Sequence, residues 1–139
     1  MIGYFDTSAL LPLLVQEPGS VRASRLWDEA DRVVSVRLAY AEGRAALAMA
    51  ARTGRIGPTS LRRAVRGLER LYRQIDFVEV NDAVVRRAGA LAEAHALRGY
   101  DAVHLAAAEE VAADQMVLVA GDRALCRAAE AVGLAVGRV

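Results

Sequence analysis

Residues 2–10 read IGYFDTSAL, an apolar run that meets a carboxylate and then two hydroxyl side chains. The first four residues predict a short buried strand, and a helix is expected over residues 7–15, with Pro12 tolerated only near its first turn. Asp6 would then stand at the carboxyl end of the strand. There it is either the N-cap of the helix or a functional carboxylate that needs partners for its charge.

Short apolar strands alternate with alanine-rich helical segments along the rest of the chain. Further strands are expected at residues 33–36, 76–80, 116–120 and 134–136. This alternation is typical of a parallel sheet with helices on both faces. The sequence therefore predicts a single three-layer α/β/α domain over residues 1–139, with a short, mainly parallel central sheet. Ligands of such sheets bind at the carboxyl ends of the strands, which is where Asp6 and Asp122 would lie.

The composition excludes several classes of protein. All 18 basic residues are arginine, and a chain without lysine is not a P-loop protein, a Schiff-base enzyme or a phospho-acceptor receiver domain. The net charge of +1 gives no overall field that would indicate a nucleic-acid partner. A single cysteine, Cys126, cannot form an internal disulfide and favours a reducing cytoplasm, and no apolar run is long enough to span a membrane.

Glu42 is the acidic residue that is hardest to explain as an ordinary surface group. Its neighbours at helical spacing are apolar and include Leu38, Ala45 and Met49, so the sequence predicts that a core helix buries this face. An unpaired carboxylate would be costly there. Either one of the many arginines pairs with Glu42, or a bound cation compensates its charge.

Three aspartates are expected near the same edge of the sheet. Asp6, Asp101 and Asp122 could each be a helix N-cap, and taken singly that is the simpler interpretation. Together with Glu42 they would repel one another unless a cation binds. Carboxylate oxygens without cysteine or paired histidines select Mg²⁺ or Mn²⁺ rather than Zn²⁺. The two histidines are not spaced to share a metal ion from one helix, and both are expected to be structural or surface groups.

The segments around the four acids together resemble a known family. YFDTSAL, YAEGRAAL, GYDAVHLAAA and AGDRALCRAAEAVG are similar to the corresponding segments of PIN-domain ribonucleases, above all the VapC-type toxins of bacterial toxin–antitoxin pairs. The resemblance covers essentially the whole chain and keeps the family's order. It implies a pocket in which Asp6, Glu42, Asp101 and Asp122 are the catalytic and metal-binding residues, ordered by the hydroxyl of Ser8.

The resemblance also implies an activity, that of an endoribonuclease dependent on Mg²⁺ or Mn²⁺ that cuts single-stranded or looped RNA. Asp6 and Asp101 would bind the principal ion, and Glu42 and Asp122 would hold a second ion or its waters. Metal-activated water would attack the phosphodiester in line and leave a 5′-phosphate and a 3′-hydroxyl. No histidine or lysine base is needed.

One position departs from the family's pattern. Many members have Thr or Ser two residues before the last aspartate, whereas this chain has Ala120. The alternative is therefore a non-catalytic PIN-like module that binds RNA or a protein without cutting. A phosphatase of the haloacid-dehalogenase type also begins with a strand and an aspartate. It is excluded, because it needs a second aspartate where Ser8 stands and a lysine that the chain lacks.

A basic stripe is the first of two candidate binding surfaces. Arg62, Arg66, Arg70 and Arg73 share one helical face. This face is either simply solvated or a contact for RNA phosphates.

The second candidate binding surface is a groove for an antitoxin. The resemblance implies a homodimer and a VapB-type antitoxin that binds near the first two helices. Leu11, Leu14 and Trp27 are expected to line this groove, with Trp27 as an aromatic anchor and with packing in the core as the alternative.

Overall fold

The computed structural model describes all residues from Met1 to Val139 and contains one five-stranded sheet. Its strands are β1 (Ile2–Phe5), β2 (Arg32–Val36), β3 (Asp76–Val78), β4 (Met116–Ala120) and β5 (Ala135–Arg138). They lie in the order β3-β2-β1-β4-β5, and every neighbouring pair is parallel. The predicted parallel sheet is therefore confirmed.

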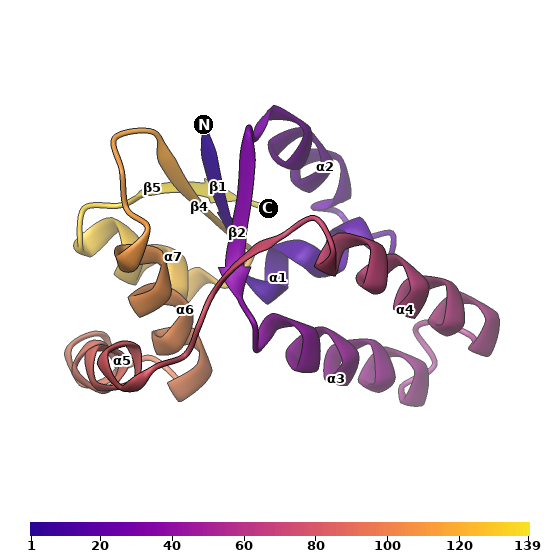
Figure 1. The fold of residues 1–139 in the computed structure, drawn as a ribbon. Helices are drawn as coiled ribbons and strands as arrows, with labels where there is room; N and C mark the ends of the chain where they lie inside the picture. The colour runs from indigo at the N-terminus through magenta and orange to yellow at the C-terminus, as the bar shows by residue number, and fades with distance from the viewer.

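Helices cover both faces of the sheet, which confirms the predicted three layers. The helices are α1 (Thr7–Leu10), α2 (Ser20–Glu29), α3 (Ala39–Arg52), α4 (Pro58–Tyr72), α5 (Asp82–His95), α6 (Gly99–Glu110) and α7 (Arg123–Ala131). Figure 1 shows α5, α6 and α7 on one side of the sheet and α1 and α2 on the other, while α3 and α4 project outward side by side. None of these helices combines the length and the apolar character needed to cross a membrane.

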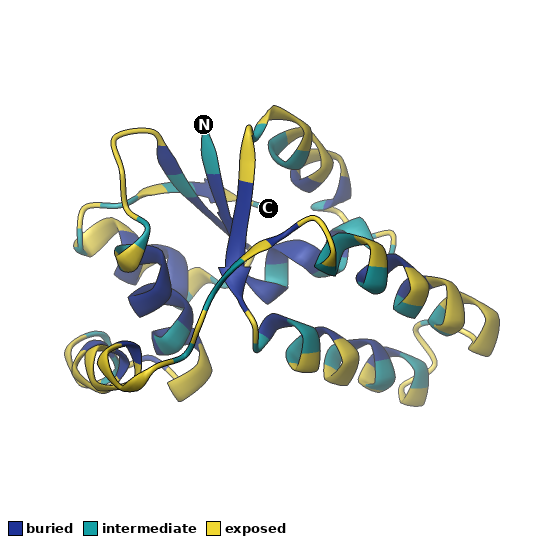
Figure 2. Cartoon of the chain, viewed as in Figure 1, coloured by how far each residue is buried: buried dark blue, intermediate teal, exposed yellow.

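The core divides along the sheet because successive strand residues point to opposite faces. Tyr4 belongs to a cluster of 19 buried residues on the side of α5, α6 and α7, whereas Phe5 belongs to a smaller cluster on the side of α1 and α2. Figure 2 shows the buried strands at the centre and the exposed outer faces of the helices. The larger of the two buried clusters therefore lies under α6, whose first turn carries Asp101.

The first helix is shorter than the sequence predicts. A continuous helix was expected over residues 7–15, but α1 ends at Leu10 and a 3₁₀ turn, η1 (Leu11–Leu13), follows with Pro12 near its start. Proline has no N–H to donate, and its ring collides with the carbonyl four residues earlier, so an α-helix cannot run through this position unchanged.

The face of α3 that the sequence assigned to the core is also different. The buried residues of α3 are Ala39, Gly43, Leu47 and Ala50, whereas the side chain of Met49 is 58% exposed. This difference arises because α3 packs against α4, α1 and η1 rather than along the sheet. The contact with α4 therefore determines which residues of α3 are buried.

The path of the chain creates a topological switch point between β1 and β4. From β1 the chain builds β2 and β3 on one side, and it then returns to place β4 and β5 on the other. In parallel sheets the connections on the two sides of such a point diverge and leave a crevice at the carboxyl ends of the strands. Asp6 directly follows β1 at this point, and Asp122 lies two residues beyond the end of β4.

Candidate active site at the carboxyl ends of β1 and β4

Each of the four predicted acids lies where a helix begins. Asp6 is the N-cap of α1 and Asp122 is the N-cap of α7, and each accepts a hydrogen bond from a backbone N–H of its helix. Glu42 and Asp101 lie in the first turns of α3 and α6. The partial positive charge of a helix N-terminus favours a carboxylate at all of these positions.

Ser8 connects Asp6 to the turn between β4 and α7. Its backbone nitrogen donates to Asp6 Oδ2 at 3.0 Å, and its hydroxyl donates to the same oxygen. The hydroxyl oxygen in turn accepts from the backbone nitrogens of Gly121, at 2.8 Å, and Asp122, at 3.3 Å. One serine therefore joins the ends of the two central strands. Although position 120 is alanine, Ser8 provides a hydroxyl to this turn.

The partner of Glu42 is a histidine rather than an arginine. His104 Nε2 lies 2.8 Å from Glu42 Oε1 and 3.3 Å from Asp6 Oδ1. The Thr7 hydroxyl donates to the same oxygen of Glu42 at 3.2 Å. His104 is therefore part of the acidic cluster, whereas the sequence predicted a structural or surface group. The available signal was its spacing, since a residue three positions after Asp101 lies on the same face of a helix.

His104 is fully buried, and its ring has polar partners on both sides. Nδ1 lies 3.2 Å from the hydroxyl of Tyr4, a residue that is also fully buried in β1. Burial by itself lowers the pKa of His104, but the negative charges of Asp6 and Glu42 outweigh it, so the pKa is raised above its usual value. Burial also raises the pKa of Tyr4, which keeps its phenolic proton.

Arg98 connects the other two acids. Its guanidinium donates to Asp101 Oδ2 at 2.8 Å and reaches Asp122 Oδ2 at 3.5 Å. Asp101 is not a cap, because Arg98 itself is the N-cap residue of α6 and makes no capping bond with its side chain. Burial raises the pKa of Asp101 even though Arg98 opposes this shift. Arg98 was not among the predicted site residues, because nothing in its spacing distinguishes it from the other arginines.

The donor chemistry of this cluster fits a hard divalent cation. All four candidate ligands present carboxylate oxygens, which Mg²⁺ and Mn²⁺ prefer. No protein group hydrogen-bonds Glu42 Oε2 or Asp101 Oδ1, so both oxygens are available to a ligand. No three His, Cys, Asp or Glu side chains form a ready-made coordination sphere. Cation binding would therefore require the carboxylates to close around the ion.

The residues predicted to contact partners lie apart from this cluster. Arg62, Arg66, Arg70 and Arg73 are exposed on α4 or just after it, and none of them is in an ion pair. Glu69, which would dilute their charge, accepts a hydrogen bond from the hydroxyl of Tyr40.

Of the three predicted groove residues, Leu11 and Leu14 pack against the same small apolar cluster of α3 and α4, whereas Trp27 packs in a different one. Leu11 lines a cavity beside α3, and Leu14 lines a separate one near Ile56. Trp27 packs edge-on against Phe5, with ring centroids 5.2 Å apart, and borders a third cavity. Core packing therefore accounts for at least part of the Trp27 side chain.

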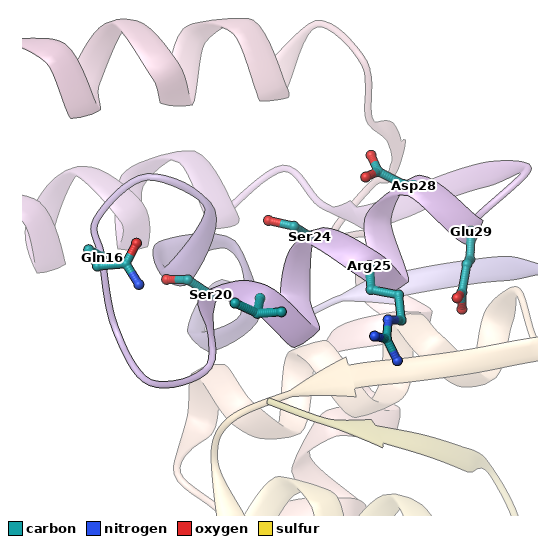
Figure 3. Close-up of a pocket in the computed structure, with 7 residues that line it drawn as sticks. Gln16, Ser20, Ser24, Arg25, Asp28 and Glu29 are labelled. Atoms are coloured by element: carbon teal, nitrogen blue, oxygen red, sulfur yellow. The ribbon is translucent and has the colours of Figure 1, made fainter.

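A shallow polar cavity of about 630 Å³ lies on α2 (Figure 3). Figure 3 shows side chains of both charges along this helix, including Arg25, Asp28 and Glu29. None of the four acids lines it. We assign it no part in the chemistry.

Comparisons with known proteins identify the family of this chain. The family model of the PIN domain matches residues 3–131. The ribonuclease VapC45 of Mycobacterium tuberculosis is 48% identical over 130 residues, which cover 94% of this chain and 90% of that protein.

Two solved structures share the fold. The first is the toxin VapC20 of M. tuberculosis, described as cleaving the sarcin-ricin loop. It superposes with a TM-score of 0.69 at 19% identity and covers 95% of each chain. The second is VapBC-5 of the same species, from the VapBC family of toxin–antitoxin systems. It superposes with a TM-score of 0.66 at 18% identity, over 99% of this chain and 98% of the other. With four acids at the switch point of a parallel sheet and these matches over nearly its whole length, the chain belongs to the PIN-domain family, in the group of the VapC proteins.

Proposed function

We propose that this protein is a divalent-metal-dependent endoribonuclease and the toxin of a toxin–antitoxin pair. The observation that carries the proposal is one connected set of hydrogen bonds and ion-pair contacts. Ser8 links Asp6 to the Asp122 turn, His104 links Asp6 to Glu42, and Arg98 links Asp101 to Asp122. Four acids from four helix starts thus form one site, and the relationship to the VapC45 ribonuclease supports RNA as its substrate.

The acids have distinct tasks in this proposal. Asp6 is held on both oxygens, by Ser8 and by His104, so it offers a fixed ligand position. Glu42 and Asp101 each keep one oxygen free and would complete the ligand set, and Asp122 would orient water at the rim. A bound Mg²⁺ or Mn²⁺ would supply Lewis-acid chemistry and an activated water for in-line attack on the phosphodiester.

RNA and an antitoxin are the partners that we propose. The unpaired arginines of α4 form a face whose planar donors match phosphate oxygens. The relationship to VapC proteins, which include toxins of VapBC toxin–antitoxin systems, supports a VapB-type antitoxin. A homodimer and a cytoplasmic location are further parts of the proposal. The non-catalytic alternative relies on Ala120 alone, and the Ser8 hydroxyl at the same turn weakens it.

The test is cleavage of total RNA by purified protein freed of antitoxin, with Mg²⁺ or Mn²⁺ and with EDTA. The informative variant is Asp6→Asn, because asparagine can still cap α1 whereas alanine would also remove the cap. Asp28→Asn on the exposed surface of α2 is the matched control. Discrete fragments are expected from the parent and from the Asp28 variant, and none with EDTA or with Asp6→Asn. A folded parent that cuts no RNA with either metal would contradict the proposal.

A further inference from the structure

A buried line of polar groups runs from the core to the acidic cluster. It begins at the hydroxyl of Tyr4 in β1, continues through the ring of His104 in α6, and ends at Glu42 and Asp6. Tyr4 and His104 are both 0% exposed, so neither can contact RNA. Every side-chain nitrogen and oxygen of the line that is buried from solvent has a hydrogen-bond partner. A buried polar network of this kind is costly unless it is complete, and a complete one holds its members in a single arrangement.

The surroundings of His104 determine where its proton lies. Three oxygens approach Nε2, those of Glu42 at 2.8 Å, Asp6 at 3.3 Å and Thr7 at 3.4 Å. Carboxylates only accept hydrogen bonds, so Nε2 must carry a hydrogen. Nδ1 faces the hydroxyl of Tyr4, which can donate to it or accept from it. Either state of Nδ1 leaves the Nε2–H donor in place.

We propose that His104 is a positioning residue of the active site, which orients Glu42 through the hydrogen bond of its Nε2–H and Asp6 through a contact at ion-pair distance, while Tyr4 fixes the ring. The inference rests on the proposed function in one respect, that the carboxylates bind a divalent cation. His104 holds Glu42 by Oε1, which leaves Oε2 as the oxygen that would meet the ion. It is neither a metal ligand nor a general base, because both ring nitrogens are already engaged within the protein.

Helix α6 is well suited to this task. Asp101 and His104 are three residues apart and face the same side, so one helix supplies a candidate ligand and the group that orients two others. After His104 the helix is buried from Leu105 to Ala108 and packs against α5, α7 and β2. A donor on such a firmly packed helix has little freedom to move. Loss of a group that orients metal ligands typically weakens metal affinity or activity by about 10–100-fold.

The test compares two amide substitutions at one position. The amide nitrogen of glutamine reaches about as far as Nε2 of histidine, whereas asparagine is shorter and cannot reach Glu42. We expect His104→Asn to raise the Kd for Mn²⁺, measured by isothermal titration calorimetry, by about 10–100-fold. His104→Gln should keep a Kd near that of the parent, and His95→Asn on α5 is the control for the same substitution elsewhere. With RNA, kcat should fall for His104→Asn while KM is unchanged, because the residue is buried.

Several outcomes would overturn the assignment. Equal Mn²⁺ affinity for the parent and a folded His104→Asn variant would show that the donor is not needed. An equal loss for the glutamine and asparagine variants would assign the effect to packing of the ring. Failure of the parent itself to bind Mn²⁺ or cut RNA would instead count against the proposed function.

A measurement on the parent protein tests the assignment even if the asparagine variant does not fold. In the ¹⁵N imidazole spectrum, His104 should carry a slowly exchanging proton on Nε2, and Mg²⁺ should shift this signal but not that of His95. An unprotonated Nε2 on His104, or a signal indifferent to Mg²⁺ in a protein that binds it, would refute the inference.

Discussion

Replacement of Ser8 by alanine tests how the two central strands are held together at the site. The hydroxyl of Ser8 makes three hydrogen bonds, one to the carboxylate of Asp6 and two from the backbone nitrogens of Gly121 and Asp122. Ser8→Ala removes all three, while the backbone nitrogen of residue 8 still donates to Asp6, the N-cap of α1. The variant therefore loosens the site without removing any acid.

The expected loss can be worked out from these contacts. A hydrogen bond to a charged group contributes about 1.5–3 kcal/mol and a neutral one about 0.5–1.5 kcal/mol. Ser8 is only partly buried and Gly121 is exposed, so water can replace part of what is lost, and we take about 2 kcal/mol in total. An unfolding entropy of about 2.1 cal/mol/K per residue gives roughly 0.3 kcal/mol/K for this chain, so Tm should fall by about 7 °C.

Differential scanning calorimetry and RNA cleavage would measure the two consequences. Activity should fall by about 10–100-fold, since Asp6 loses one of the groups that orient it. Ser24→Ala is the matched control, because Ser24 is an exposed serine of α2 whose side chain makes no hydrogen bond within the protein. A free energy of unfolding for Ser8→Ala within about 0.5 kcal/mol of the parent would refute the reasoning, since that is the usual range for surface substitutions.

Two further predictions follow from burial and charge. Burial raises the folded-state pKa of Asp101 above the ordinary 3.8, so ionised Asp101 costs stability at neutral pH, and the cost disappears as the pH falls through the raised pKa. Asp101→Asn should therefore raise Tm at neutral pH without divalent cations, by a margin that shrinks on acidification, and a lower Tm at neutral pH would contradict this. Replacing Arg66 and Arg70 by alanine should weaken RNA binding and reduce the slope of log affinity against log salt by roughly 1.4, the value for two phosphate contacts on a single strand. Substitution of Arg25 and Arg86 removes the same charge elsewhere, and an equal effect from both pairs would reject a specific contact.

The order of the elements and the location of the acids could be predicted from the sequence because both depend on local pattern. Strand β4 was predicted with its observed bounds, since five consecutive apolar residues between polar segments leave little choice. Parallel pairing followed from the helix between each pair of strands. The position of Asp6 at the carboxyl end of β1 then followed from topology alone.

The charge partners could not be predicted, because they depend on how separate elements pack together. His104 lies 62 residues from Glu42 in the chain, and only the docking of α6 against the strands brings them together. The spacing of three residues is compatible with a shared helical face for His104 and Asp101, but a buried core histidine with no part in a site could have the same spacing. Glu42 was predicted on a face of α3 buried in the core, but its side chain is 23% exposed and Met49 on the same predicted face is 58% exposed, because α3 packs against α4, α1 and η1 rather than along the sheet.

The charges at the switch point explain why this fold can hold four acids and why its chemistry would need a cation. Four carboxylates meet one guanidinium, that of Arg98, and one imidazole, that of His104, together with the positive ends of the helices. This internal compensation is partial, so the site keeps a negative charge. A phosphodiester is itself an anion and would be repelled from such a site. A divalent cation would therefore have two effects, closing the carboxylates into one ligand set and making the approach of RNA favourable.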